Sequence, residues 1–102
     1  MKISSFNKFL NELYIEKLKT YNHFHEGEIN QLKKYDFNVN GNIAIGENDN
    51  ITIKIEKELD KNHRNIFYWE IKSNNNEIEE GYEYSLYDTI TEISRNLSKL
   101  DI

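Results

Sequence analysis

The sequence lacks cysteine and proline altogether and contains only four glycines and one alanine in 102 residues. Without cysteine the chain can form neither a disulfide nor a zinc site with thiolate ligands. The glycines, at positions 27, 41, 46 and 81, match neither a phosphate-binding loop nor a dinucleotide-binding fingerprint. No serine lies in a G-x-S-x-G motif. These absences argue against an enzyme, and we expect neither catalytic residues nor a cofactor.

Long apolar runs are also missing. No run approaches the roughly 20 residues of a membrane-spanning helix, and the first 19 residues lack the continuous apolar segment of a signal peptide. Hydrophobic residues make up 37% and charged residues 30% of the chain, which is typical of a folded domain rather than a disordered segment. We therefore expect one domain over residues 1–102, located in the cytoplasm.

Two segments show the three- and four-residue spacing of apolar positions that is typical of helices packed on a core. The N-terminal segment has Phe6, Phe9, Leu10, Leu13, Leu18 and Tyr21. The C-terminal segment has Leu86, Ile90, Ile93, Leu97 and Leu100. Ser85 can cap the C-terminal helix, with Asp88 three residues further on. Ile29, Leu32 and Tyr35 predict a short additional helix between the two.

Between residues 37 and 84 the apolar spacing changes to two, which indicates strands with one buried face. The clearest strands cover residues 51–58 and 66–72, and a last strand is predicted over 78–84 with a bulge at Gly81. This order predicts an α+β fold of two layers. We expect an antiparallel meander of three to four strands, with the N-terminal and C-terminal helices packed on one face.

The pairing of the two clearest strands can also be predicted. With Lys54 opposite Glu70, unlike charges meet, whereas a shift by two residues would set Glu56 against Glu70. The first register also places Ile55 opposite Trp69, and we expect this tryptophan to be buried against the helices.

His23 and His25, followed by Glu26 and Glu28, form the one cluster in the sequence that resembles metal ligands. No third strong ligand follows at a diagnostic spacing. We therefore expect an exposed loop between helices and no metal site.

Acidic side chains are concentrated in the last third of the chain. Residues 73–102 contain seven acids and two bases, so this third alone carries a charge equal to the whole net charge of −5. Neither lysine nor arginine occurs between Lys72 and Arg95, and tyrosines are interleaved with the acids. Such a segment is either a solvated acidic face or a docking surface for a basic protein. The residues expected to contact a partner are Glu77, Glu79, Glu80, Glu83, Tyr87 and Asp88.

The strand that carries these acids has its own predicted orientation. Its alternation predicts that Glu77, Glu79 and Glu83 share one side, and that Ile78, Tyr82 and Tyr84 face the helices. Tyr87 would then be the better exposed aromatic side chain.

In size, acidity and helix–sheet–helix order the chain resembles anti-CRISPR proteins, which are small inhibitors from mobile elements. Some of them occupy the basic nucleic-acid channel of a CRISPR effector with carboxylates in place of phosphates. The resemblance implies a stoichiometric inhibitor of a nucleic-acid-handling bacterial effector. The same description fits immunity proteins and antitoxins that neutralise a toxin nuclease, and the strand–GYEYS–helix segment is loosely similar to the end of HicB-like antitoxin domains.

A nucleic-acid-binding domain is a further alternative, because the order of elements resembles that of double-stranded-RNA-binding domains. Those domains hold phosphates with lysines at the start of their last helix. Here the corresponding segment, residues 85–88, has no base and ends in Asp88, which repels a phosphate backbone. Other candidates for phosphate contacts are Lys17, Lys19, Lys33 and Lys34.

Overall fold

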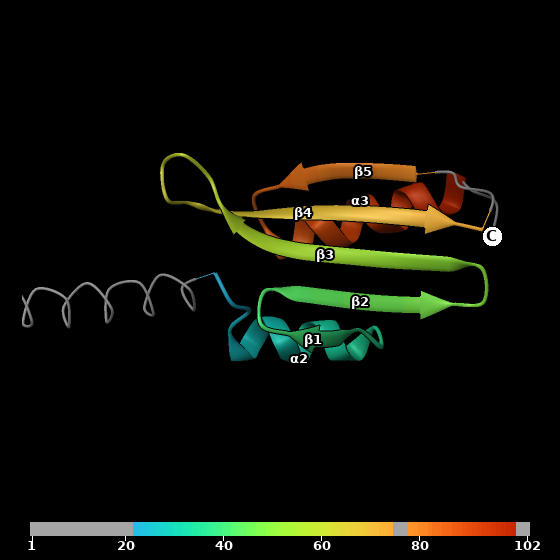
Figure 1. Ribbon diagram of the computed structural model, residues 1–102, viewed down its shortest axis with the longest axis horizontal. Coiled ribbons are helices and arrows are strands. Elements are labelled where there is room, and N and C mark those ends of the chain that lie inside the picture. The colour runs from blue at the N-terminus through green and yellow to red at the C-terminus, as the bar shows by residue number, and fades with distance from the viewer. Residues whose placement is uncertain (1–21, 75–77, 100–102) are drawn as a thin grey trace, which may run out of the picture.

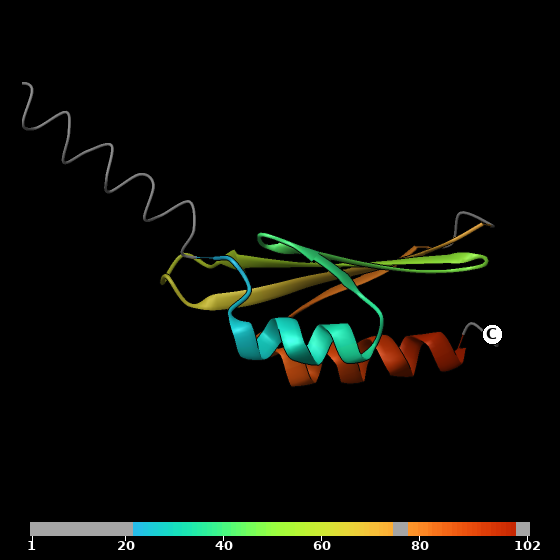
Figure 2. The same ribbon diagram turned by 90° about the horizontal axis from the view of Figure 1, so that it is seen from below.

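The computed structural model describes residues 22–74 and 78–99. These residues form one antiparallel sheet with two helices on the same face, as Figures 1 and 2 show. The helices are α2 (Glu26–Lys34) and α3 (Leu86–Lys99). The strands are β1 (Asn38–Asn40), β2 (Ile43–Asn48), β3 (Ile51–Leu59), β4 (Asn65–Ser73) and β5 (Ile78–Glu83). No helix in this part of the chain is both long and apolar enough to cross a membrane.

The two-layer α+β class is confirmed, but the sheet has five strands and not three to four. The strands follow one another in the order β1-β2-β3-β4-β5. The additional strand arises because the chain reverses at Gly41, which has a φ of +64°, and pairs Asn40 with Ile43. The apolar spacing of two already begins at Phe37, but the prediction of three to four strands did not separate β1 from β2 at Gly41. The N-terminal helix predicted from Phe6 to Tyr21 lies outside the described residues.

The predicted register of the central strands is confirmed. Lys54 lies opposite Glu70, and Ile55 lies opposite Trp69. Side chains on neighbouring strands that are directly opposite point to the same face. The register therefore sends Ile55 and Trp69 together to the helix side and sets a positive charge beside a negative one on the open side.

The core lies between the sheet and the helices. Trp69 is 4% exposed, and Ile55 and Ile71 are fully buried beside it. From the helix layer, Leu32 of α2 and Ile93 of α3 complete this core. The N-terminus of α3 is capped as predicted, because the backbone N–H of Asp88 donates to Ser85 Oγ at 3.0 Å.

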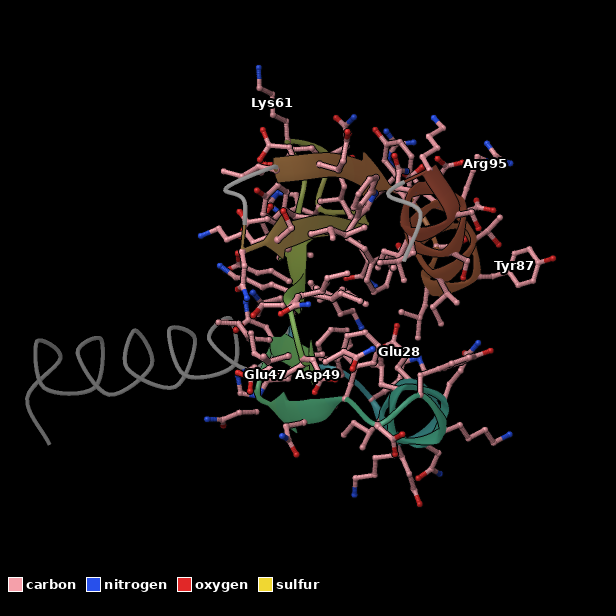
Figure 3. All side chains as sticks on the ribbon, turned by 90° about the vertical axis from the view of Figure 1, so that its right-hand side faces the viewer. Glu28, Glu47, Asp49, Lys61, Tyr87 and Arg95 are labelled. Carbon is pink, nitrogen blue, oxygen red and sulfur yellow. The ribbon has the colours of Figure 1, made fainter. Side chains whose placement is uncertain are left out.

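A buried ion pair joins α2 to the sheet. Lys57 is 3% exposed on the helix side of β3, and its Nζ lies 2.7 Å from Glu28 Oε1. The same Nζ donates to the backbone oxygen of His23 at 3.3 Å. Glu28 also accepts from the backbone N–H of His25, whose Nδ1 in turn accepts from the N–H of Glu28. His25 is therefore the N-cap of α2, and Figure 3 shows Glu28 on the inner side of the helix layer.

Removing one partner of this pair should destabilise the fold more than removing both charges. We expect Lys57→Met to lower the free energy of unfolding by about 3–5 kcal/mol, because it leaves Glu28 buried without its cation. The double variant Lys57→Met with Glu28→Gln should lose clearly less, since no uncompensated charge remains. Chemical denaturation of the three proteins measures this difference. Equal losses in the single and double variants would show that Glu28 is solvated well enough to need no partner.

Trp69 and Gly81 should be energetically coupled. A Cβ added at Gly81 would lie 2.8 Å from the indole of Trp69, so Gly81→Ala should cost about 1–3 kcal/mol through overpacking. Trp69→Ala should cost about 3–5 kcal/mol on its own. In the Trp69→Ala background Gly81→Ala should be nearly neutral. Denaturant melts of the four proteins form a double-mutant cycle, and simple additivity would contradict the contact.

Candidate functional site

The edge strand β5 presents its side chains opposite to expectation. Its register sets Ile71 opposite Glu79, Trp69 opposite Gly81 and Phe67 opposite Glu83, so Glu79 and Glu83 lie on the helix side. The prediction that Ile78, Tyr82 and Tyr84 face the helices is wrong. These three side chains are 55%, 57% and 61% exposed.

The contact between Trp69 and Gly81 explains this inversion. Only a residue without Cβ fits beneath the indole, so the glycine must lie opposite Trp69. A slip by one residue would bring Glu80 or Tyr82 under the ring and exchange the two faces of the strand. The bulge predicted at Gly81 is absent for the same reason, since the pairing with β4 runs through Gly81 without interruption.

Glu83 has a structural role in this arrangement. Its carboxylate Oε2 accepts a hydrogen bond of 2.9 Å from the indole Nε1 of Trp69. A buried indole N–H without an acceptor would be costly, because a buried donor that loses its partner pays its desolvation penalty. Glu83 therefore belongs both to the acidic segment and to the support of the core.

On the open face of the sheet, Tyr68 bridges two glutamates. Its hydroxyl oxygen lies 2.5 Å from Glu80 Oε2 and 2.9 Å from Glu70 Oε2, so the two carboxylates share the single proton that the hydroxyl donates. Glu70 and Glu80 are directly opposite each other on β4 and β5, so their like charges meet at the tyrosine. The ring of Tyr82 packs on that of Tyr68, with centroids 5.1 Å apart.

The hydrogen bonds change how these groups titrate. The bond to Glu80, followed by burial and the bond to Glu70, raises the pKa of Tyr68 above its usual value of 10. The Tyr68 hydroxyl, together with nearby Lys72, lowers the pKa of Glu70 below its usual 4.5 against a smaller opposing effect of burial. The raised pKa of Tyr68 keeps its hydroxyl protonated as a donor, and the lowered pKa of Glu70 favours the ionised form of that carboxylate.

Exposed apolar side chains gather at the same edge. The large hydrophobic residues that are exposed are Tyr35, Ile78, Tyr82, Tyr84 and Tyr87. All but the first belong to β5 or to the bend and first turn of helix that follow it. Tyr87 is the most exposed at 73%, as expected, and Figure 3 shows it projecting from α3 away from the sheet. Scattered exposed tyrosines are ordinary, but four of the five exposed large hydrophobic side chains here lie within residues 78–87, although not on one face.

The acids of this edge have no cationic partner among the residues that the structure describes. Segment 78–88 contains four acids and no base, and none of the six ion pairs involves it. The nearest bases pair elsewhere. Lys72 lies 3.4 Å from Glu70, Arg64 lies 3.1 Å from Asp60, and Arg95 lies 2.9 Å from Glu92. The acids of this edge therefore form no direct ion pair within the described residues, although the Arg64 guanidinium lies 5.1 Å from the centroid of the Tyr84 ring.

We call this surface the acidic rim. It consists of Ile78, Glu79, Glu80, Tyr82, Glu83, Tyr84, Tyr87 and Asp88. Of the predicted contact residues, Glu79, Glu80, Glu83, Tyr87 and Asp88 lie in it, and Glu77 lies outside the described residues. They do not form one face, because Glu80 points to the open side, Glu79 and Glu83 to the helix side, and the last two stand on α3.

Sequence reasoning missed the contribution of β4 to this surface. Tyr68 and Glu70 alternate with buried residues and were therefore predictable as solvent-facing. Their contact with Glu80 depends on the register between β4 and β5, which the position of Gly81 could have revealed.

The structure also allows the predicted histidine cluster and two cavities to be considered as candidate sites. Of the histidines predicted to lie in an exposed loop, His25 caps α2, and no group of three His, Cys, Asp or Glu side chains within 22–74 and 78–99 could hold a metal. A groove of about 180 Å³ between the helices is mostly apolar. It is lined by Tyr35, Phe37, Ile53, Ile90, Ile93, Ser94 and Leu97. A neighbouring cavity of about 400 Å³ includes Asp36 and Glu47 but none of the rim residues.

No family model, curated protein or solved structure matches the chain. Function is therefore inferred from the charge, exposure and geometry of the acidic rim.

The Tyr68–Glu70 bond makes a pH-dependent contribution that can be measured. Because Glu70 has a lowered pKa in the folded protein, its bond stabilises the fold above pH 4.5, and this stabilisation fades as the pH falls through the lowered value. Tyr68→Phe should therefore raise the pKa of Glu70 and should cost more stability at pH 7 than at pH 3. Carboxyl ¹³C NMR titration and melts at both pH values test this. An unchanged Glu70 titration in the variant would show that the hydroxyl does not reach Glu70 in solution.

Proposed function

We propose that the chain is a stoichiometric inhibitor, of the anti-CRISPR kind, that binds a basic surface of a nucleic-acid-handling bacterial effector. The observation that supports this proposal is the coincidence of two features on the acidic rim. Carboxylates without cationic partners and most of the exposed large hydrophobic side chains occupy the same edge.

Each feature supplies a different part of binding. Clustered carboxylates steer a basic partner toward the rim and raise the association rate. Tyrosines such as Tyr82 and Tyr87 add rigid amphipathic contact area at a small entropic cost. A basic groove that normally holds phosphates offers the complementary charge.

A macromolecular partner fits the rim better than a small substrate. Neither of the two cavities described above includes a rim residue. Small ligands are held in concave pockets that bury most of their surface, whereas exposed edges and helix ends serve protein contacts. Direct binding of nucleic acid through the rim is disfavoured, because a phosphate backbone would meet four acids and no base in segment 78–88.

An immunity protein or antitoxin that neutralises a toxin nuclease is the second candidate, since such a nuclease also presents a basic surface. The neighbouring gene separates the two candidates. A toxin gene beside this one supports immunity, whereas an operon of phage genes supports inhibition of a defence system.

Charge reversal on the rim should abolish binding while leaving the fold intact. The partner is first captured from the native host and purified, and its affinity is then measured by calorimetry. We expect Glu79→Lys with Glu80→Lys to weaken binding at least about 100-fold, since losing one member of a desolvated pair costs about 2–5 kcal/mol. Glu83 is left unchanged because its reversal would remove the acceptor of the buried Trp69 Nε1, whereas the Tyr68 hydroxyl keeps Glu70 as an acceptor when Glu80 is changed.

A matched control reverses two exposed acids that lie away from β5, at the end of β2 and in the turn after it, Glu47→Lys with Asp49→Lys, which changes the net charge equally (Figure 3). This variant should bind like the unchanged protein. Equal weakening by both variants would point to net charge alone, and normal binding by the rim variant would show that the rim is only a solvated face.

The stoichiometry of inhibition can be measured separately. The effector's activity on nucleic acid should fall linearly as the protein is added, and it should reach its minimum at a fixed molar ratio of the two proteins. Substoichiometric inhibition would contradict a stoichiometric mechanism.

A further inference from the structure

We propose that the partner supplies an extended, basic segment that pairs with the outer edge of β5 and becomes a sixth strand of the sheet. This inference rests on the proposed function, and it specifies how the basic partner is held. The acidic rim then acts through its backbone as well as through its side chains.

The outer edge of β5 is available for such pairing. β5 is the last strand in the sheet order, and it forms the upper rim of the sheet in Figure 1. Within residues 22–74 and 78–99, its only backbone partner is β4. Because successive backbone groups of an edge strand point outward, they can pair with an extended chain.

The charge of β5 selects which strand can add. A second copy of the chain pairing through β5 would bring the three glutamates of one strand close to the three glutamates of the other, and like charges this close repel each other. A strand with lysines or arginines at the matching positions would instead form cross-strand ion pairs. The edge is therefore protected from self-association and open to a basic segment.

The alternation of β5 gives the partner segment a pattern. On the open side it presents Ile78, Glu80 and Tyr82, and on the helix side Glu79, Gly81 and Glu83. A complementary antiparallel segment begins opposite Glu83 and ends opposite Ile78. From its N-terminus it carries a basic residue, an apolar residue, any residue, two basic residues and an apolar residue. The apolar residues lie beside Tyr82 and Ile78, whose side chains are more than half exposed.

A short peptide with this pattern tests the inference on the full chain. The probe is acetylated and amidated Lys-Val-Thr-Lys-Lys-Val, added to ¹⁵N-labelled protein and followed by NMR. At ten times the dissociation constant, the outward amide protons of β5 should exchange with solvent about tenfold more slowly, because only the unbound fraction exchanges. A peptide with glutamine in place of each lysine should give no protection.

Backbone methylation of the peptide separates strand pairing from attraction between charges. Two peptides keep the same side chains but carry N-methyl groups on either the odd or the even residues, so only one of them blocks the edge that faces β5. We expect one methylated peptide to bind like the parent and the other to lose binding at least tenfold.

Each other outcome overturns the inference. If both methylated peptides bind like the parent, or if the protected amides lie outside β5, the rim binds by charge alone and the proposed function stands. If the parent peptide does not bind, strand addition is wrong, and the proposed function is judged separately by the charge-reversal variants with the captured partner.

Discussion

The placement of Trp69 over Gly81 determines how this surface is built. The indole needs a residue without a side chain beneath it, and β5 offers one glycine. Once Gly81 lies opposite Trp69, the alternation of the strand determines which face of the sheet each other residue of β5 points to. The glutamate two residues further on reaches the indole nitrogen, the hydrophobic residues turn outward, and Glu80 meets Glu70 at the hydroxyl of Tyr68. One packing contact thereby sets the chemistry of the whole edge.

The buried pair of Lys57 and Glu28 has a similar organising role at the other end of the core. It binds α2 to β3 through a 2.7 Å contact, and Glu28 also closes the capping box of the helix. Buried ion pairs add little net stability compared with apolar residues of the same volume, but they are sensitive to misplacement. We interpret this pair as an interaction that determines the position of α2, a helix of nine residues, on the sheet.

The sequence predicted the fold best where the alternation of apolar residues was long. β3 and β4, with nine residues each, were recognised together with their register, and the stripe of α3 and its cap at Ser85 were found. β1 lies within the alternation that begins at Phe37, but with three residues it was not counted as a strand separate from β2. β5 was recognised but assigned the wrong orientation, because its alternation places Ile78 and Tyr82 on one side, together with Glu80, and Glu79 and Glu83 on the other. In an alternating strand the apolar face usually packs against the core. In β5 a single steric requirement of Trp69 outweighs that preference, and the candidate site follows from the exception.

The rim divides into positions that the core constrains and positions that it does not. Gly81 and Glu83 are tied to the indole, so changing either one affects folding. Glu79, Tyr82 and Tyr87 make no such contact with the core and can vary at little cost to stability. Under the proposed function, a lineage whose partner changes can therefore substitute the unconstrained residues of the rim while it retains Gly81 and Glu83. The fixed glycine would keep the strand in register through every such change, so the scaffold is suited to rapid diversification and equally to deliberate retargeting.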